Sequence, residues 1–293
     1  MPIIIRAENL VKRFRSVDAL RGLNIDVPQG SIYALVGSNG AGKTTAIKTM
    51  LNILYPTSGR SEVLGIDSRN LAGNAFLSIG YISENQDLPD WMTVRHFLGY
   101  MRPFYPTWDR QLEAELLRNF DLPLDHKLRA LSRGMRMKAA LASSLAYRPK
   151  LIVLDEPFSG LDPLVRDELV QSLSERTAEA TIFISSHDML EIESLASHVG
   201  YLQEGKLLFS EEMESLSDRF REVEVSLHAP APIVDPWPST WLQVDVSETA
   251  IRFVESGFSD GLTPQRIRSI FGETRGATYH QMSLRSIFIA IAR

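Results

Sequence analysis

Residues 37–44 read Gly37-Ser38-Asn39-Gly40-Ala41-Gly42-Lys43-Thr44, which completes the pattern G-x-x-x-x-G-K-[ST]. The β-prone residues 31–36 precede this stretch, and residues 44–54 are predicted to be helical. A strand, a glycine-rich turn and a helix form the context in which backbone N–H groups surround phosphate oxygens. A chance match is expected in only about 1% of chains of this length. We therefore predict a phosphate-binding loop at the N-terminus of a helix.

The last residues of this loop have the side chains that nucleotide chemistry requires. Lys43 is expected to reach the β- and γ-phosphates of a nucleotide, and the Thr44 hydroxyl is expected to bind Mg²⁺. Thr45 follows in the first turn of the helix. The predicted phosphate site therefore comprises Gly37, Ser38, Asn39, Gly40, Ala41, Gly42, Lys43, Thr44 and Thr45.

Two acidic residues follow another predicted strand. Residues 151–154 are all apolar, as in a buried parallel strand, and Asp155 and Glu156 come directly after them. Asp155 stands where a carboxylate would hold Mg²⁺, and Glu156 stands where one would orient and polarise the water that attacks the γ-phosphate. The alternative is a pair of acids in an ordinary strand-to-loop turn, which the intact phosphate loop argues against.

A histidine follows a third apolar strand, residues 181–185, after Ser186. His187 could contact the γ-phosphate and the attacking water. A lone histidine at a strand end is more often a polar residue with a local partner. The residues alone leave both interpretations of His187 open.

The order of several motifs resembles that of the ABC ATPases. Leu131-Ser132-Arg133-Gly134-Met135 is similar to their signature, LSGGQ, and precedes a predicted helix and the Asp155 strand. Phe14 resembles the aromatic A-loop residue, residues 159–162 resemble the D-loop, and His187 resembles the switch histidine. The resemblance covers about residues 3–215 and is specific because the motifs occur in the family's order.

This resemblance implies partners and cofactors. In the family, two ATPase domains face each other head to tail, and ATP lies between the phosphate loop of one and the signature of the other. ATP, Mg²⁺, ATP hydrolysis and a second ATPase subunit, either identical or a paralogue, are therefore expected. Phe14 would stack on adenine, although a core role is the alternative. The ATP-binding set would also include Ser132, Arg133, Gly134, Met135 and Asp162.

The sequence departs from the family pattern in its signature and its Q-loop. Arg133 replaces the first signature glycine, and Met135 replaces the glutamine. Glu84 stands at the Q-loop position, with Gln86 as an alternative. Glu84 would serve as an oxygen ligand for Mg²⁺. These departures, together with residues 104–109 and 283–288, resemble the ABC-2-type exporter branch and its YtrB-like bacterial subgroup.

The predicted fold class is α/β, a P-loop NTPase of the ABC ATPase type. Alternating helices and strands predict a mainly parallel core sheet, joined by an N-terminal antiparallel β subdomain and a helical insertion at about residues 88–148. A cluster of prolines after a composition break near residue 220 predicts a domain boundary. The expected domains are residues 1–219, the ATPase, and residues 220–293, a small α+β appendage.

Composition limits the classes of partner. The net charge is −5, which argues against nucleic acid, and no cysteine is present, which excludes disulfides and Cys-ligated zinc. No apolar run approaches the roughly 18 residues that a spanning helix needs. If the chain serves a membrane process, another chain must therefore supply the spanning helices. The resemblance to ABC ATPases implies that this other chain is a separate transmembrane permease subunit, and it implies a cytoplasmic location, peripheral on the inner face of the membrane.

The surface that meets the permease is expected at residues 88–100, with Trp91 and Met92 as candidate exposed anchors, although a core role is possible for either. Two other functions remain alternatives. One is a soluble ABC ATPase that acts on a non-membrane partner, and the other is an ATP-binding regulator without turnover.

Overall fold

The structure is a computed structural model that describes residues 1–84, 86–176, 179–232 and 234–291. The chain divides into two compact units, Met1–Ser210 and Glu211–Arg293. The domain boundary predicted after residue 219 lies nine residues beyond this division, at the end of α7 (Met213–Arg219). Whether residues 1–219 fold independently stays a prediction.

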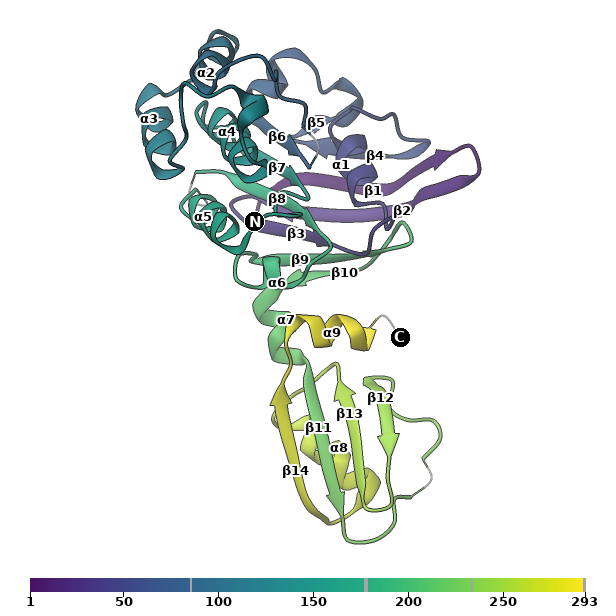
Figure 1. Cartoon of the computed structure of the whole chain (residues 1–293). Helices are drawn as coiled ribbons and strands as arrows, with labels where there is room; N and C mark the ends of the chain where they lie inside the picture. Colours follow the sequence, from purple (N-terminus) through teal and green to yellow (C-terminus); the bar gives the residue numbers. More distant parts are fainter. Residues whose placement is uncertain (85, 177–178, 233, 292–293) are drawn as a thin grey trace. The chain divides into compact units, whose positions relative to one another are not determined.

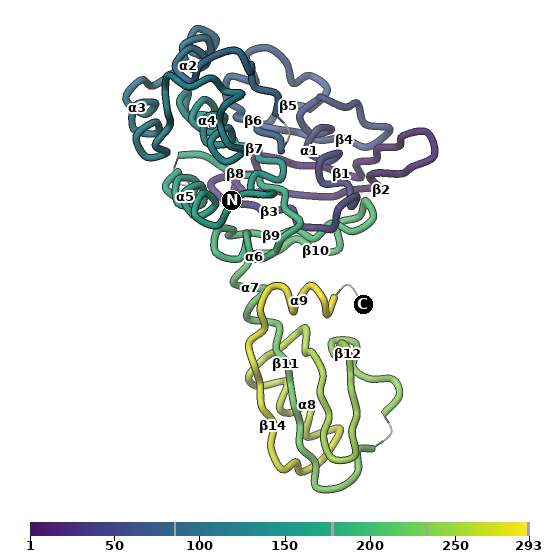
Figure 2. The backbone as a smooth tube through the Cα atoms, viewed as in Figure 1, coloured from purple at the N-terminus to yellow at the C-terminus, as the bar shows by residue number. Residues whose placement is uncertain are grey.

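A six-stranded sheet forms the centre of the first unit (Figure 1). Its order is β10-β9-β3-β8-β7-β6, and the strands from β9 to β6 run parallel, which confirms the predicted core sheet. Strands distant in sequence lie side by side in the chain trace (Figure 2). β3, β7 and β8 are buried at every residue, as expected for strands covered on both faces. The bounds are β3 Ile32–Val36, β6 Ile79–Ser83, β7 Leu151–Asp155, β8 Thr181–Ser186, β9 His198–Gln203 and β10 Lys206–Glu212.

A four-stranded antiparallel sheet, β2-β1-β4-β5, forms the predicted N-terminal β subdomain. Its strands are β1 Ile3–Phe14, β2 Val17–Pro28, β4 Ser58–Val63 and β5 Ile66–Asp67. The helix α1 (Lys43–Met50) shares one hydrophobic cluster with both sheets through residues such as Leu10, Leu35 and Ile47. This shared core fixes the start of α1 against the end of β3.

The helical insertion comprises α2 Val94–Met101, η3 Arg102–Phe104, α3 Arg110–Asn119, η4 Leu128–Ala130 and α4 Arg133–Leu145. In Figure 1 these helices gather beside β6 and β7. Each α-helix begins at a side-chain cap: Thr93, Asp109 and Ser132 accept hydrogen bonds from backbone N–H groups of the first turns. α4 is buried along most of its length, so the signature segment Ser132–Met135 is attached to a rigid element.

The remaining elements of the first unit are η1 Ser68–Asn70, η2 Gly73–Ser78, α5 Pro163–Ser174 and α6 Leu190–Glu193. The described part of the second unit has the antiparallel sheet β12-β13-β11-β14 and, besides α7, the helices α8 and α9. Trp241 stacks on Phe253 at 3.8 Å between ring centroids, and Val223 and Ile267 belong to the same cluster. This arrangement is the predicted α+β appendage. Its bounds are β11 Arg221–Leu227, β12 Trp241–Val246, β13 Ala250–Glu255, α8 Leu262–Phe271, β14 Thr274–Gln281 and α9 Leu284–Ile291.

Candidate active site

The parallel register brings the ends of the motif strands to one edge of the central sheet. Val36 of β3 pairs with Ser186 of β8. Asp155 of β7 pairs with Ser185 of β8 and with Ser83 of β6. The carboxyl ends of parallel strands form the edge at which α/β sheets bind ligands. The residues that follow these strands therefore meet there, namely Gly37, Glu84, Glu156 and His187.

Two glycines let the phosphate loop pass close to neighbouring backbone. A Cβ atom at Gly37 would lie 2.2 Å from the carbonyl oxygen of Leu202. Gly42 has a φ of 109°, and a Cβ atom there would lie 2.5 Å from the carbonyl oxygen of Ala19. A side chain at either position would displace the loop from the strands that support it.

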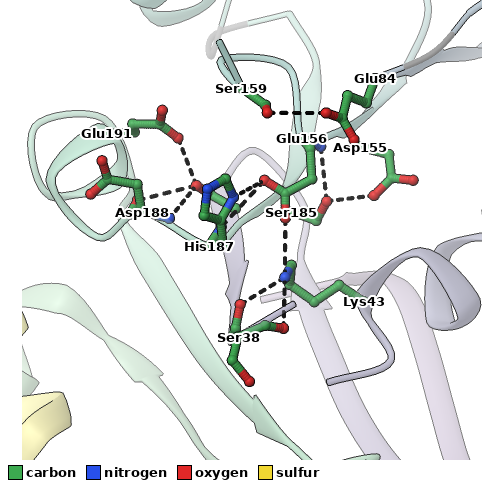
Figure 3. A network of polar contacts seen from close by, with 12 residues as sticks. Ser38, Lys43, Glu84, Asp155, Glu156, Ser159, Ser185, His187, Asp188 and Glu191 are labelled. Carbon is green, nitrogen blue, oxygen red and sulfur yellow. Dashed lines mark hydrogen bonds and ion pairs between the residues drawn. The ribbon is translucent and has the colours of Figure 1, made fainter. Parts of the chain in front are cut away.

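Lys43 is buried inside the loop and paired with three oxygens (Figure 3). Its Nζ donates to the carbonyl oxygens of Gly37 at 2.7 Å and Ser38 at 3.1 Å. The same nitrogen lies 3.0 Å from Oε1 of Glu156, and only 6% of the Lys43 side chain is exposed. A buried ammonium needs such partners. An incoming phosphate would compete with Glu156 for this cation.

Thr44, Asp155 and Ser185 form a chain of hydrogen bonds beside Lys43. The Thr44 hydroxyl donates to Oδ1 of Asp155 at 3.0 Å, and the Ser185 hydroxyl donates to the same oxygen at 2.6 Å. Asp155 is 3% exposed. The hydroxyl and the carboxylate predicted to bind Mg²⁺ are therefore in direct contact. Their oxygens are of the hard type that Mg²⁺ prefers.

Glu156 is held by its backbone as well as by its side chain. Its N–H donates to the carbonyl oxygen of Ser185 at 3.2 Å and to the Ser185 hydroxyl at 3.0 Å. Its φ of 53° lies in the left-handed region, which costs a non-glycine residue about 1 kcal/mol or more. The side chain is 9% exposed. The surrounding contacts thus hold this carboxylate in a strained but defined position.

His187 pairs with the same carboxylate. Its Nδ1 lies 2.7 Å from Oε2 of Glu156, and its backbone N–H donates to that oxygen at 3.3 Å. The hydrogen bond to Glu156 raises the pKa of His187 above its ordinary value, while partial burial acts in the opposite direction. His187 therefore has a local partner, as one of its two interpretations expected. That partner is Glu156, the candidate catalytic carboxylate.

The segment after β8 is fixed by a second buried carboxylate. The Ser186 hydroxyl donates to Oε2 of Glu191 at 2.7 Å and accepts from the backbone N–H of Asp188 at 3.0 Å. Burial raises the pKa of Glu191, although the hydrogen bond from Ser186 opposes the shift. These contacts orient the turn that presents His187 (Figure 3).

A cavity of about 370 Å³ adjoins this network. Among the described residues, Val17, Arg21 and Glu204 also line it, and the sequence did not single these out. Predicted residues on its wall are Asn39, Gly40, Gly42, Lys43, Thr44, Thr45, Glu84 and Glu156. The predicted residues outside that wall, among those that the structure describes, are Phe14, Gly37, Ser38, Ala41, Ser132, Arg133, Gly134, Met135, Asp155, Asp162 and His187.

Phe14, the candidate adenine platform, lies at the end of β1 and is 42% exposed. The Lys12 ammonium lies 4.9 Å from its ring centroid and donates to the carbonyl oxygen of Tyr55 at 2.7 Å. A core role for Phe14 does not fit this exposure. Its stacking on adenine stays a prediction.

The signature residues make contacts within their own chain. The Ser132 hydroxyl accepts from the Met135 N–H at 3.2 Å, so it caps α4. A Cβ atom at Gly134 would lie 3.0 Å from Cγ1 of Val165. Asp162 caps α5 through the Val165 N–H at 3.1 Å. The Arg133 guanidinium donates to Oε1 of Glu84 at 3.0 Å, and the sequence did not predict this pairing.

Ser159 and Ser185 are two polar residues of the network for which the sequence predicted no contact. Both hydroxyls bond to carboxylates of the predicted site, Ser159 to Glu84 at 3.0 Å and Ser185 to Asp155. Ser185 ends the apolar run of β8, so the pairing of β8 with β7 would have located it. Ser159 is the first residue of the predicted D-loop, but nothing in its spacing indicates Glu84 as a partner.

Comparisons with known proteins agree with this geometry. The family model described as ABC transporter matches residues 20–159. The bacitracin transport ATP-binding protein BcrA of Bacillus licheniformis is 36% identical over 229 residues, which cover 76% of this chain and 74% of BcrA. The ABC transporter ATP-binding protein YtrB of Bacillus subtilis is 27% identical, with coverage of 76% and 77%.

Solved structures show the same fold. The structure of an ATP-binding subunit of an ABC transporter has a TM-score of 0.67 and 25% identity, covering 73% of this chain and 92% of its own. The dimeric post-hydrolysis state of the cassette MJ0796, bound to ADP and Pi, has a TM-score of 0.65 and 21% identity, covering 71% and 98%. The chain therefore belongs to the ABC transporter ATP-binding proteins, in agreement with the ABC-2 exporter branch, and is an ATP-binding ATPase.

Proposed function

We propose that this chain is the ATP-hydrolysing subunit that drives a separate transmembrane subunit of an ABC-2-type exporter. The observation that carries the proposal is the contact network at the sheet edge. It joins Lys43 to Glu156 at 3.0 Å and Thr44 to Asp155 at 3.0 Å, with His187 on the far side of Glu156. This network, which adjoins one cavity, contains a cation that can bind phosphate (Lys43), a pair that can bind a metal ion (Thr44 and Asp155) and a candidate general base (Glu156).

The residues present fit Mg²⁺·ATP. Mg²⁺ in such sites is usually held by one or two carboxylates together with phosphates and water. The Thr44 hydroxyl and Asp155 would hold the ion, and the Glu84 carboxylate on the cavity wall would approach it. When bound, the ion would neutralise charge that develops on the phosphates.

Hydrolysis would use Glu156, which is buried, and His187, whose side chain is 40% exposed. Glu156 would orient the attacking water and accept its proton, and His187 would fix the Glu156 carboxylate and contact the γ-phosphate. In the structure Glu156 is paired with Lys43. Phosphates that pair with Lys43 would release Glu156 for this task.

A second ATPase subunit would complete the site in a head-to-tail dimer. Ser132 and Met135 are exposed at the start of α4, and Asp162 is exposed at the start of α5. These positions suit contact with the nucleotide of a partner, because a helix N-terminus favours phosphate. The dimeric structures of the related cassette MJ0796 support this arrangement.

The membrane subunit would dock on the helical insertion from the cytoplasmic side. No helix in the described part of the chain has the length and apolarity to span a bilayer. Trp91 is 71% exposed, and Tyr100 and Phe104 are also exposed. Met92 is only 8% exposed, so the expectation that it is an exposed anchor was wrong. The Met92 carbonyl and N–H bond to neighbouring backbone, and its side chain packs inward.

Two alternatives, a soluble ATPase and a regulator without turnover, are separated by one experiment. The chain is purified and its ATP turnover is measured alone and in proteoliposomes with the membrane protein encoded beside it. We expect turnover that rises with the membrane protein and that falls back when Trp91 is changed to alanine. Turnover that never responds to a membrane protein would favour the soluble ATPase. Tight ATP binding without turnover would favour the regulator.

A further inference from the structure

The Glu84 carboxylate joins three motifs that are distant in sequence. Its Oε1 accepts a hydrogen bond from Nη2 of Arg133 at 3.0 Å and one from the Ser159 hydroxyl at 3.0 Å. Arg133 is the first residue of α4, and Ser159 lies in the loop between β7 and α5. One oxygen therefore connects the signature, the end of β6 and the segment before the D-loop aspartate.

Arg133 is positioned by a second contact. Its Nη1 would lie only 2.7 Å from a Cβ atom built on Gly160, so the guanidinium lies directly across the backbone of that glycine. An arginine at this point of the signature thus packs within its own chain. It is not directed toward the Lys43 cavity, whose wall, among the described residues, includes Glu84 but not Arg133.

Glu84 faces two compartments. It lines the cavity of about 370 Å³ that contains Lys43 and Thr44, and it also lines a neighbouring cavity of about 390 Å³ together with Arg133. A carboxylate that binds Mg²⁺ gives up electron density and charge that would otherwise hold a guanidinium. Arg133 and the metal are therefore competitors for the same group.

We infer that Arg133 is a positioning residue that holds Glu84 away from Mg²⁺ in the nucleotide-free chain, and that Mg²⁺·ATP displaces it. Loading of the nucleotide then frees the first turn of α4 from the loop after β6. The inference rests on the proposed function, because it takes Glu84 as a ligand of the metal. It assigns to Arg133 a role within its own chain before any partner is bound.

The competition has a modest strength. The side chains of Arg133 and Glu84 are 49% and 36% exposed, and pairs at this level of exposure change equilibria by roughly 2- to 5-fold. Removing Arg133 should therefore raise the affinity for Mg²⁺·ATP by about 2- to 5-fold. When a chelator removes Mg²⁺, Glu84 has no metal ion to bind. The affinity for ATP in the presence of the chelator should therefore not change.

The experiment compares ATP affinity with Mg²⁺ and with EDTA by calorimetry, in a Glu156→Gln background and at concentrations where size exclusion shows a monomer. Arg133→Gln should raise the ratio of the ATP affinity with Mg²⁺ to the ATP affinity with EDTA. Arg133→Lys, which keeps the charge, should raise this ratio less. Arg136→Gln is the matched control. It removes an arginine of the same helix whose partner, at 2.6 Å, is Asp90 and not Glu84.

A double-mutant cycle identifies the partner of Arg133. Glu84→Gln should lower the ratio, and adding Arg133→Gln to it should cause no further change. An unchanged ratio in Arg133→Gln, or an equal change in Arg136→Gln, would overturn the inference. Failure of the proposed function would give a different result, since the parent protein would then show no preference for Mg²⁺·ATP over ATP with EDTA.

Discussion

Replacing Glu156 by glutamine tests the ion pair at the centre of the site. Glutamine keeps the shape of the side chain but removes the negative charge that faces Lys43 at 3.0 Å and His187 at 2.7 Å. The variant should therefore do two things. It should lose hydrolysis, because the candidate base is gone, and it should bind ATP more tightly, because Lys43 loses a competing partner.

The burial of Lys43 sets the size of the expected changes in stability and in ATP affinity. Lys43 is 5% exposed, and an uncompensated buried charge costs about 3 kcal/mol at the low end of measured values. The low end applies because the carbonyl oxygens of Gly37 and Ser38 still accept hydrogen bonds from Lys43. The nucleotide-free variant should therefore lose up to about 3 kcal/mol of stability. ATP restores a negative partner, so affinity should rise by at most about a hundred-fold.

Denaturant unfolding of the ATPase unit, with and without an ATP analogue that is not hydrolysed, measures both effects, and a phosphate-release assay measures turnover. Turnover should fall at least about a hundred-fold. Glu191→Gln is the control, since Glu191 is a buried carboxylate of the same region that bonds to Ser186. A variant at Glu156 that is as stable as the parent and binds ATP no better would refute the ion-pair argument. Near-normal turnover would move the role of base to Asp155 or His187.

Three further outcomes are expected. Lys43→Ala should abolish tight ATP binding, because the phosphates lose their cation; parent-like affinity in a binding titration would contradict the phosphate-loop assignment. Residues 1–219 should fold and bind ATP without the appendage, as judged by circular dichroism and nucleotide titration, and an insoluble product would refute that boundary. NMR titration of His187 should give a pKa above 6.5 that falls in Glu156→Gln. Because this pKa is raised on folding, the stabilisation from the His187–Glu156 pair is complete below about pH 6.5 and is lost as pH rises through the higher value.

The sequence was most informative where a local motif and a strand coincide. The glycines of residues 37–44 and the apolar runs ahead of Asp155 and His187 located the phosphate loop and both catalytic candidates, because parallel strands end at one edge.

Long-range pairings were not predictable in the same way. β1 extends to Phe14, well beyond the apolar run at residues 3–5, because its antiparallel neighbours β2 and β4 supply the hydrogen bonds. β6, β9 and β10 have mixed patterns, so they were missed as strands. The Arg133–Glu84 contact joins residues 49 positions apart and depends on how α4 packs against β6.

Head-to-tail assembly of two chains around ATP is the step on which the transport mechanism depends. Ser38 lies in the phosphate loop and Ser132 in the signature, and both are exposed. Ser132 is a better site than Gly134, where an added Cβ atom would meet Val165 at 3.0 Å. The chain contains no cysteine, so Ser38→Cys and Ser132→Cys in a Glu156→Gln protein give an unambiguous disulfide crosslink. A crosslinked dimer that forms with ATP and not without it is the expected result, and an ATP-loaded protein that stays uncrosslinked would contradict the shared site.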